Sequence, residues 1–281
     1  MDYTYIRHIP SPPLDAYIDY LYYQNSFRYS HEKMLPMKSL HLLVSFGDAI
    51  KVFDAFRAKP VAVLTESWVI GTWNVCHVAD WPLDMQFFGV CFKPGKAYPF
   101  LQLPLSELHN QFMPLDVIWG HYDAEIREQL YTAPTIQAGF TLFERLLLAR
   151  LGEAPHGLDV VQYAIGEIAR HHGVVSIRTL SEYIGISQNH LNTHFKRMVG
   201  TSPKEIARLY RFESVLNSID PTQPVDWTLI ARQFRYYDLS HLNKDFEAFI
   251  GHSPTDYLRL RRQMWTENPE HDRLLRTLPF D

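Results

Sequence analysis

Two cysteines, no long apolar run and no large excess of charge set the first limits on this chain of 281 residues. Cys76 and Cys91 form no C-x-x-C pair and no zinc spacing, so we expect small buried thiols in a reducing compartment, with a redox pair as the less favoured alternative. No stretch approaches 18 uninterrupted apolar residues, and residues 1–13 lack the basic start and apolar core of a signal peptide. The sequence therefore predicts a cytoplasmic protein with no membrane partner.

Signatures of catalysis and metal binding are also missing. The chain contains no H-E-x-x-H, Walker or dinucleotide motif. The first half of the chain shows no metal-ligand spacing among its candidate ligands, His31, Glu32, His41 and His77. We therefore expect no catalytic residues, no metal and no cofactor.

Charge is distributed unevenly. Residues 1–170 carry 13 Lys/Arg against 18 Asp/Glu, whereas residues 171–265 carry 12 against 9, with six histidines besides. A mildly basic C-terminal segment permits binding of a polyanion, but an ordinary solvated surface would look the same. The charge distribution alone does not decide between a polyanion-binding surface and an ordinary solvated surface.

Two periodicities divide the chain. β-branched and aromatic runs bounded by Gly, Asp and Pro predict strands at 40–46, 50–56, 61–71 and 85–92, and apolar spacing within 12–23 predicts a short helix. From residue 115 onwards apolar residues recur three and four apart. We expect an α+β chain with a first domain over 1–151 (mostly β over 1–112, helical over 115–151), a linker over 152–157, an all-α domain over 158–265 and a polar tail over 266–281.

One short phrase occurs twice, as "VGTSPKE" (199–205) and "IGHSPTD" (250–256). Each copy follows a segment with apolar residues at i, i+4, i+7 and i+8. Gly200 and Gly251 stand where a helix ends in a left-handed residue. Ser-Pro-x-acid then supplies a capping serine, a proline at the first helical position and an acid that can complete a capping box. The phrase predicts the end of one helix and the start of the next.

The halves before each phrase match as well. Ser176 and Asp226 are predicted N-caps of the two leading helices, and the second copy carries one extra residue in its turn. Each unit then reads helix, turn of three to five residues, helix, which is the geometry of a helix-turn-helix whose second helix enters a DNA major groove. Ordinary bundles contain such pairs too, but two copies are too few for a solenoid. A joining helix from Pro203 to about Ile219, about 25 Å long, suits recognition helices near one DNA turn apart.

Residues 158–262 resemble the C-terminal DNA-binding domain of AraC-family transcription regulators. The resemblance rests on "TLSEYIGISQNHLNTHFKRMVGTSPKEI" and "LIARQFRYYDLSHLNKDFEAFIGHSPTDYLRLRR". The segments "LPMKSLHLLVSFG", "FFGVCFKPGKAYPFL" and "PLDVIWG" resemble a sensor domain found on some members. The resemblance implies a cytoplasmic transcription regulator that binds double-stranded DNA in the major groove over two successive turns. It also implies a small-molecule effector in a sensor and dimerisation domain, and RNA polymerase as a partner if the protein is an activator.

Carried over by position, the resemblance assigns DNA contacts to two helices. The first would use Asn189, His190, Asn192, Thr193, Lys196 and Arg197, and the second Leu239, Ser240, Asn243 and Lys244. Asparagine can hold adenine through two hydrogen bonds, and leucine can touch a thymine methyl group. His190 and Arg197, with Arg208 and Arg211, are expected at phosphates. The alternative for each polar residue is simple solvation of an outer helix face.

Two departures from the family pattern fall in the second unit. Arg235-Tyr236 replaces the usual Gly-Phe, and if the first of these positions takes a positive φ, arginine there costs on the order of 1 kcal/mol. Glu247-Ala248 replaces the usual basic pair. Both predict a weaker grip on DNA by the second unit, and they motivate an alternative function, a protein-interaction module with weakened DNA binding. An enzyme of the DNA-repair methyl-acceptor kind would need an activated cysteine, and neither cysteine has a Pro-Cys-His-type neighbourhood.

Two features of the first domain leave alternatives open. Its many aromatic side chains either line an effector pocket or form a plain core; they are Tyr17, Tyr20, Tyr22, Tyr23, Trp68, Trp73, Trp81, Phe87 and Phe88. The apolar stretch 135–151 either pairs with its copy in a homodimer or is buried within one chain.

Overall fold

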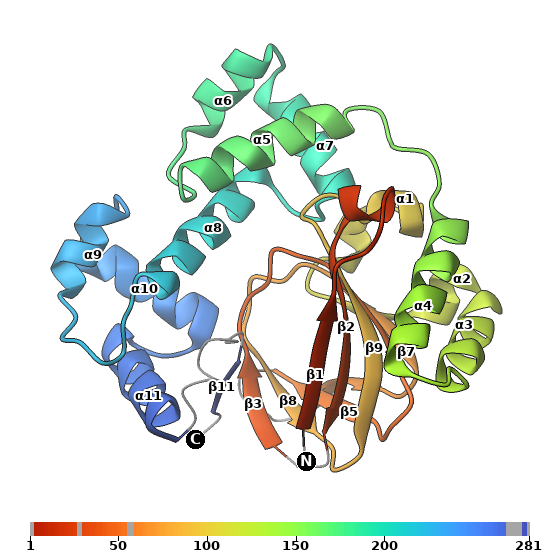
Figure 1. Cartoon of the computed structure of the whole chain (residues 1–281). Helices are drawn as coiled ribbons and strands as arrows, with labels where there is room; N and C mark the ends of the chain where they lie inside the picture. Colours follow the sequence, from red (N-terminus) through yellow and green to blue (C-terminus); the bar gives the residue numbers. More distant parts are fainter. Residues whose placement is uncertain (1–2, 27–29, 55–58, 268–276, 280–281) are drawn as a thin grey trace.

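The computed structural model describes residues 3–26, 30–54, 59–267 and 277–279, and its N-terminal part holds two antiparallel sheets (Figure 1). The strands of the first sheet run, from edge to edge, β1 (Tyr3–His8), β2 (Ile18–Ser26), β9 (Met85–Phe92), β4 (His41–Ser45), β7 (Ser67–Ile70) and β10 (Phe112–Pro114). The second has the order β11 (Thr277–Pro279), β3 (Ser30–Met34), β8 (His77–Trp81), β5 (Ile50–Phe53) and β6 (Pro60–Leu64).

The first sheet is covered on both faces. One face packs on the second sheet, through a core that includes Tyr20, Tyr22 and Phe87. The other face packs on helices, through Tyr23, Phe88 and the residues around them. The helical elements between 14 and 150 are η1 (Leu14–Ala16), α1 (Tyr98–Leu101), η2 (Leu105–Leu108), α2 (Leu115–Trp119), α3 (Tyr122–Tyr131) and α4 (Ile136–Arg150). In the middle of β2, residues 20–23 are therefore apolar or aromatic and buried on both faces.

That double burial explains why the helix predicted at 12–23 is wrong. Only Leu14–Ala16 forms a single turn of 3-10 helix, and the chain then enters β2. A strand buried on both faces loses the polar alternation that identifies strands, and its apolar residues also fit a helical spacing. The predicted strand at 61–71 is two strands, β6 and β7, and the strands at 3–8, 30–34 and 77–81 were not predicted.

Helix α4 occupies the ambiguous stretch 135–151 and is buried within the chain. Thr135 caps it by accepting a hydrogen bond from the Ala138 N–H at 3.1 Å. Phe140 and Phe143 are completely buried in the core beneath the first sheet. Most of its apolar face is thus buried within the chain, as the second of the two alternatives predicts, and Leu148 stays 47% exposed.

Seven helices follow the sheets among the described residues. They are α5 (Leu158–Arg170), α6 (Ile177–Ile184), α7 (Gln188–Met198), α8 (Pro203–Asn217), α9 (Trp227–Gln233), α10 (Leu239–Ile250) and α11 (Pro254–Glu267). One hydrophobic core joins them, built around Phe195, Phe212, Phe246 and Phe249. Figure 1 shows α8 as the connection between a group formed by α5, α6 and α7 and a group formed by α9, α10 and α11.

The repeated phrase is helical punctuation in both copies. Gly200 and Gly251 have φ of 98° and 73°, the left-handed conformation that ends a helix without a Cβ clash. Ser202 accepts a hydrogen bond from the Glu205 N–H at 3.1 Å, and Ser253 accepts one from the Asp256 N–H at 3.1 Å. A proline is the first helical residue of both α8 and α11. The prediction of a helix end followed by a capped helix start is confirmed at both sites.

The acidic residue of the repeated phrase has a different hydrogen-bond partner in each copy. The Ser253 hydroxyl donates to Asp256 Oδ2 at 2.6 Å, so this acid stays at the helix start. Glu205 Oε2 instead accepts a hydrogen bond from Asn74 Nδ2 at 3.0 Å, a residue that follows β7 in the first domain. The capping-box role expected for Glu205 is thus replaced by a contact between the domains.

The second turn is longer than the first, by two residues where the sequence predicts one. Residues 185–187 separate α6 from α7, and residues 234–238 separate α9 from α10. The predicted N-caps are confirmed, because Ser176 accepts from the Thr179 N–H and Asp226 accepts from the N–H groups of Thr228 and Leu229. Arg235 has φ of 53°, so the positive φ considered from the sequence is present.

The first domain contacts the helical domain along α5, α7 and α8. Arg197 Nη2 donates a hydrogen bond to the Tyr98 hydroxyl at 2.8 Å, and Thr72 Oγ1 donates to the Val199 carbonyl at 3.2 Å. Lys38 forms an ion pair with Glu213 of α8. Because these partners are more than 95 residues apart in sequence, none could be read from local spacing.

The expected polar tail is only partly described. Helix α11 extends to Glu267, and Thr277–Pro279 pairs antiparallel with β3, which places these three residues at the edge of the second sheet. Residues 268–276 and 280–281 lie outside the described part of the chain. Among the helices described, none combines the length and the apolar character needed to cross a membrane.

Acidification is expected to destabilise the fold. Burial lowers the pKa of His77, His109, His194 and His252 from the ordinary value of about 6.5. Below that value the unfolded chain binds more protons than the folded chain, so stability is lost as pH falls. We expect the Tm measured by circular dichroism to fall from about pH 7.5 to about pH 5.5. His77→Gln should flatten this dependence; an unchanged or rising Tm in the wild type would contradict the assignment.

Candidate DNA-binding surface

The burial pattern of α7 separates its two faces. Leu191, Phe195 and Met198 are completely buried in the helical core. Ser187 caps the helix by accepting from the His190 N–H at 3.2 Å. The residues proposed from the sequence lie on the other face, where Asn189, His190, Thr193, Lys196 and Arg197 are exposed and Asn192 is half-buried.

Several side chains on this outer face already have neighbours. The rings of His190 and His194 stack with centroids 4.4 Å apart. Thr193 Oγ1 donates to the Asn189 carbonyl at 3.0 Å. The Arg197 guanidinium lies over the Tyr98 ring, 5.0 Å from its centroid, besides bonding its hydroxyl. Of the six candidates on α7, Arg197 is thus the one held by the first domain.

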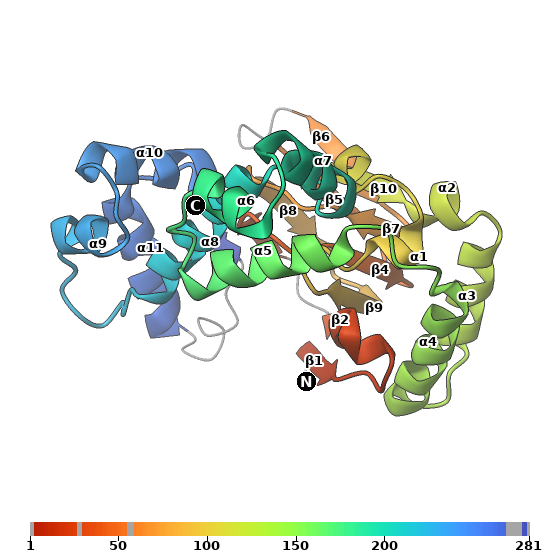
Figure 2. The ribbon, with the colours of Figure 1, turned by 90° about the horizontal axis from the view of Figure 1, so that it is seen from above.

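Helix α10 is divided in the same way. Leu242, Phe246, Phe249 and Ile250 are completely buried. On the outer face Leu239, Ser240 and Lys244 are exposed and Asn243 is half-buried. Glu247 and Ala248 are exposed as well, so the acid that departs from the family pattern does face outwards. Seen from above in Figure 2, α7 and α10 lie on the same side of α8.

A buried ion cluster that was not predicted fixes α10 against α8. Asp245 is 1% exposed, and its Oδ1 accepts from Arg208 Nε at 2.9 Å. Its Oδ2 accepts from the Tyr236 hydroxyl at 2.8 Å and from Arg211 Nη2 at 3.4 Å. Burial and the neighbouring Asp245 carboxylate raise the pKa of Tyr236 well above its usual range. The cluster fixes the orientation of α10 on α8, and with it the direction of the exposed face of α10.

This cluster corrects the role expected for two arginines. Arg208 and Arg211 were expected at DNA phosphates, but both are part-buried and form ion pairs with the buried carboxylate of Asp245. The sequence held one signal, since Asp245 stands between Leu242 and Phe246 within the apolar stripe of α10. A carboxylate on a buried helix face requires a cationic or hydrogen-bonding partner.

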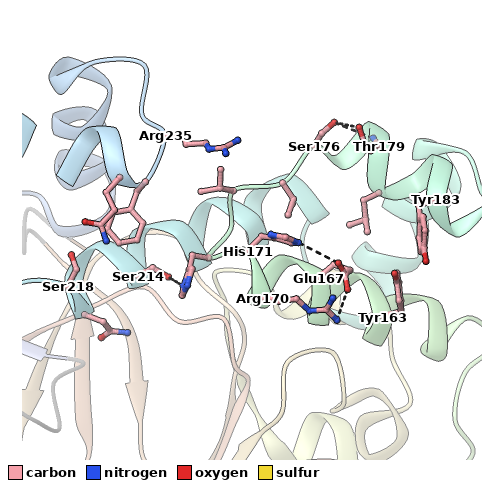
Figure 3. A pocket seen from close by; sticks show the side chains of 17 residues that line it. Tyr163, Glu167, Arg170, His171, Ser176, Thr179, Tyr183, Ser214, Ser218 and Arg235 are labelled. Atoms are coloured by element: carbon pink, nitrogen blue, oxygen red, sulfur yellow. Dashed lines mark hydrogen bonds and ion pairs between the residues drawn. The ribbon is translucent and has the colours of Figure 1, made fainter. Parts of the chain in front are cut away.

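A groove of about 1070 Å³ separates the two helix-turn-helix units. Its walls come from the end of α5, the loop before α6, α6 itself, the end of α8 and the turn after α9. In Figure 3 Arg235 stands on one side of this groove, and Ser176, Thr179 and Tyr183 stand on the other. Sequence reasoning missed the groove because its walls are contributed by segments from 163 to 235 that meet only in the fold. Within the described residues, no group of three or more His, Cys, Asp or Glu side chains could hold a metal ion.

Comparison with solved structures finds matches of low sequence identity. A structure of apo ToxT from Vibrio cholerae aligns with a TM-score of 0.42 and 11% identity, over 85% of this chain and 96% of that one. ToxT with an unsaturated fatty acid bound aligns with a TM-score of 0.41 and 10% identity, over 92% and 95%. The AraC-like transcriptional activator CuxR aligns with a TM-score of 0.29 and 13% identity, over 69% and 76%. No curated protein matches this chain.

Family models match both parts of the sequence. Residues 6–114 match a domain of unknown function, DUF6597, and residues 180–260 match a helix-turn-helix domain. The second match covers α7, α8, α9 and α10, which form the two units and their connection, and parts of α6 and α11. The sequence therefore matches DUF6597 over its first part and a helix-turn-helix domain over its C-terminal part.

Proposed function

We propose that this chain is a sequence-specific DNA-binding transcription regulator whose two recognition helices, α7 and α10, enter successive major grooves of one duplex. The observation that carries the proposal is that one continuous helix, α8, holds two capped helix-turn-helix units whose recognition helices expose polar outer faces. Helix α8 has 15 residues and is about 22 Å long. Because each unit extends beyond its end of α8, the separation between α7 and α10 is expected to approach one DNA turn, about 34 Å.

Base reading is assigned to the outer faces. On α7 the assigned residues are Asn189, Asn192 and Thr193, and on α10 they are Leu239, Ser240 and Asn243. Positively charged or flanking side chains are assigned to phosphates; these are His190, Lys196, Arg197 and Lys244. With Arg208 and Arg211 committed to Asp245, the phosphate contacts of the domain fall to these exposed residues.

The first domain is proposed to bind a small effector and to act on α7. Support comes from the contacts of Tyr98 with Arg197 and of Thr72 with the Val199 carbonyl, which connect it to the first recognition helix. Tyr20, Tyr22, Trp73 and Phe87 lie in the core between the two sheets, so the effector is assigned to this domain as a whole and to no single aromatic residue. Paired DNA sites would bring two copies of the chain together, and an activator would also contact RNA polymerase.

Selection from a pool of randomised duplexes, followed by anisotropy titration of the enriched site, tests the proposal. Asn192→Ala should weaken binding of the enriched site by about 10- to 100-fold and relax the preference at one base pair, because it removes a bidentate contact. Gln137→Ala, on the exposed face of α4, is the matched control and should leave affinity unchanged.

Two results would contradict this function. If the wild-type chain enriches no sequence, specific DNA binding is wrong. If a site is enriched but Asn192→Ala binds it with unchanged affinity and preference, the base-reading role of α7 is wrong. If the wild-type chain shows no affinity for DNA even at low salt but still binds a protein partner, the interaction-module alternative is favoured.

A further inference from the structure

The groove between the two units lies where a bound duplex must pass. In a helix-turn-helix the second helix enters the major groove while the first helix crosses the sugar–phosphate backbone. Helix α6 and the turn after α9, which form opposite walls of the groove, belong to the leading parts of the two units. If α7 and α10 occupy successive major grooves, as the proposed function requires, the minor groove between them faces this opening.

The basic side chains that line the groove differ in whether they already have partners within the chain. Arg170 Nη2 is paired with Glu167 Oε1 at 2.8 Å, and His171 Nε2 lies 3.7 Å from Glu167 Oε2. His172 Nδ1 lies 3.3 Å from Ser214 Oγ. The Arg235 side chain, by contrast, makes no hydrogen bond or ion pair within the part of the chain that the structure describes, and it is exposed; only its backbone N–H is bonded, to the Arg232 carbonyl at 3.1 Å.

The backbone at Arg235 adds an independent observation. Its φ of 53° lies in the left-handed region, where a side chain with a Cβ is disfavoured and glycine is not. Non-glycine residues held in this conformation concentrate at functional sites, where the surrounding structure compensates for the strain. In Figure 3 this strained residue projects its guanidinium at the edge of the groove, opposite α6.

We propose that the groove receives the minor groove of the duplex midway between the two recognition helices, and that Arg235 inserts its guanidinium there. A narrow minor groove has an enhanced negative potential that attracts arginine, and runs of A·T pairs make it narrow. The protein would then prefer A·T pairs at the centre of its site although no recognition helix touches them. In this arrangement Arg235 strengthens DNA binding. The sequence predicts the opposite, because arginine replaces the family's usual glycine at this position.

Arg235→Gly is the decisive variant because it removes the charge while relieving the backbone. The variant should have a Tm at least as high as that of the wild type, so a binding defect cannot be attributed to misfolding. On the site enriched by the wild type, its affinity should fall by about five- to tenfold. The slope of log affinity against log salt should become shallower by about one, and the preference for central A·T over G·C pairs should disappear. Arg259→Ala, which removes the same charge from the exposed side of α11, should change none of these.

A second variant tests the groove from the opposite direction. Glu167→Gln removes the acid that pairs with Arg170 and His171, so it should raise affinity for the same duplex by about two- to fivefold. Failure of the wild type to enrich any sequence would overturn the proposed function itself. If the wild type enriches a site but Arg235→Gly keeps its affinity, salt slope and central preference, the proposed function stands and the minor-groove contact is overturned.

Discussion

Asp245→Ala is expected to lower the free energy of unfolding by about 3–5 kcal/mol, the range for breaking a buried ion pair by removing one partner. The carboxylate is buried and bonds Arg208, Arg211 and the Tyr236 hydroxyl, so its loss leaves two part-buried arginines without a counter-charge. Asp245→Asn keeps the shape but loses the charge, and we expect a smaller loss of about 1–3 kcal/mol.

Urea denaturation followed by circular dichroism measures this effect. Glu247→Ala is the control, since Glu247 is an exposed acid on the same helix and its removal should cost less than about 0.5 kcal/mol. If Asp245→Ala costs no more than this control, the two arginines must reach solvent without rearranging α10. The orienting role of the cluster would then be wrong.

Gly173→Ala is the second substitution for which we expect a large effect, about 3–5 kcal/mol of lost stability. Gly173 has φ of 75°, and a Cβ there would stand 2.0 Å from the Ala207 carbonyl oxygen and 2.4 Å from the Arg211 amide nitrogen. Both atoms belong to the backbone of α8, which cannot move aside without displacing the helix that joins the two units. The turn after α5 can approach α8 this closely only with glycine at this position.

A matched control separates strain from contact. Gly185 has a similar φ of 82°, but a Cβ there meets no atom within 4 Å. Gly185→Ala should therefore cost only the left-handed strain, about 1 kcal/mol. The difference between the two variants in the same denaturation assay measures the close approach to α8. Equal losses would show that backbone conformation alone requires glycine at 173.

Features with local causes were predictable from the sequence. A helix end and a capped helix start depend on residues within four positions of each other, so Gly200, Ser202 and Ser176 could be assigned without a structure. The positive φ of Arg235 was considered because the resemblance places a glycine at this position, and the structure shows it. The outer faces of α7 and α10 followed from their apolar stripes in the same way.

Features that depend on distant partners were not predictable. Glu205 fits a capping box locally, but Asn74, 131 residues earlier, takes its carboxylate. Arg208 and Arg211 look like phosphate ligands until α10 brings Asp245 to them. Strand β2 looked helical because the partners that bury its two faces lie on the second sheet and on α4. In each case the deciding free energy comes from a contact that sequence spacing does not record.

If the chain binds DNA as proposed, the single helix α8 has a consequence for the direction of binding. It connects two outer faces of different composition, with Asn189, Asn192 and Thr193 on one and Leu239, Ser240 and Asn243 on the other. A duplex read by both faces presents a different half-site to each, so one bound chain distinguishes the two ends of its site. Inverting the site would turn the first domain to point the other way along the DNA. A regulator built in this way reads an asymmetric DNA site, so the orientation of that site relative to a promoter affects the outcome of binding.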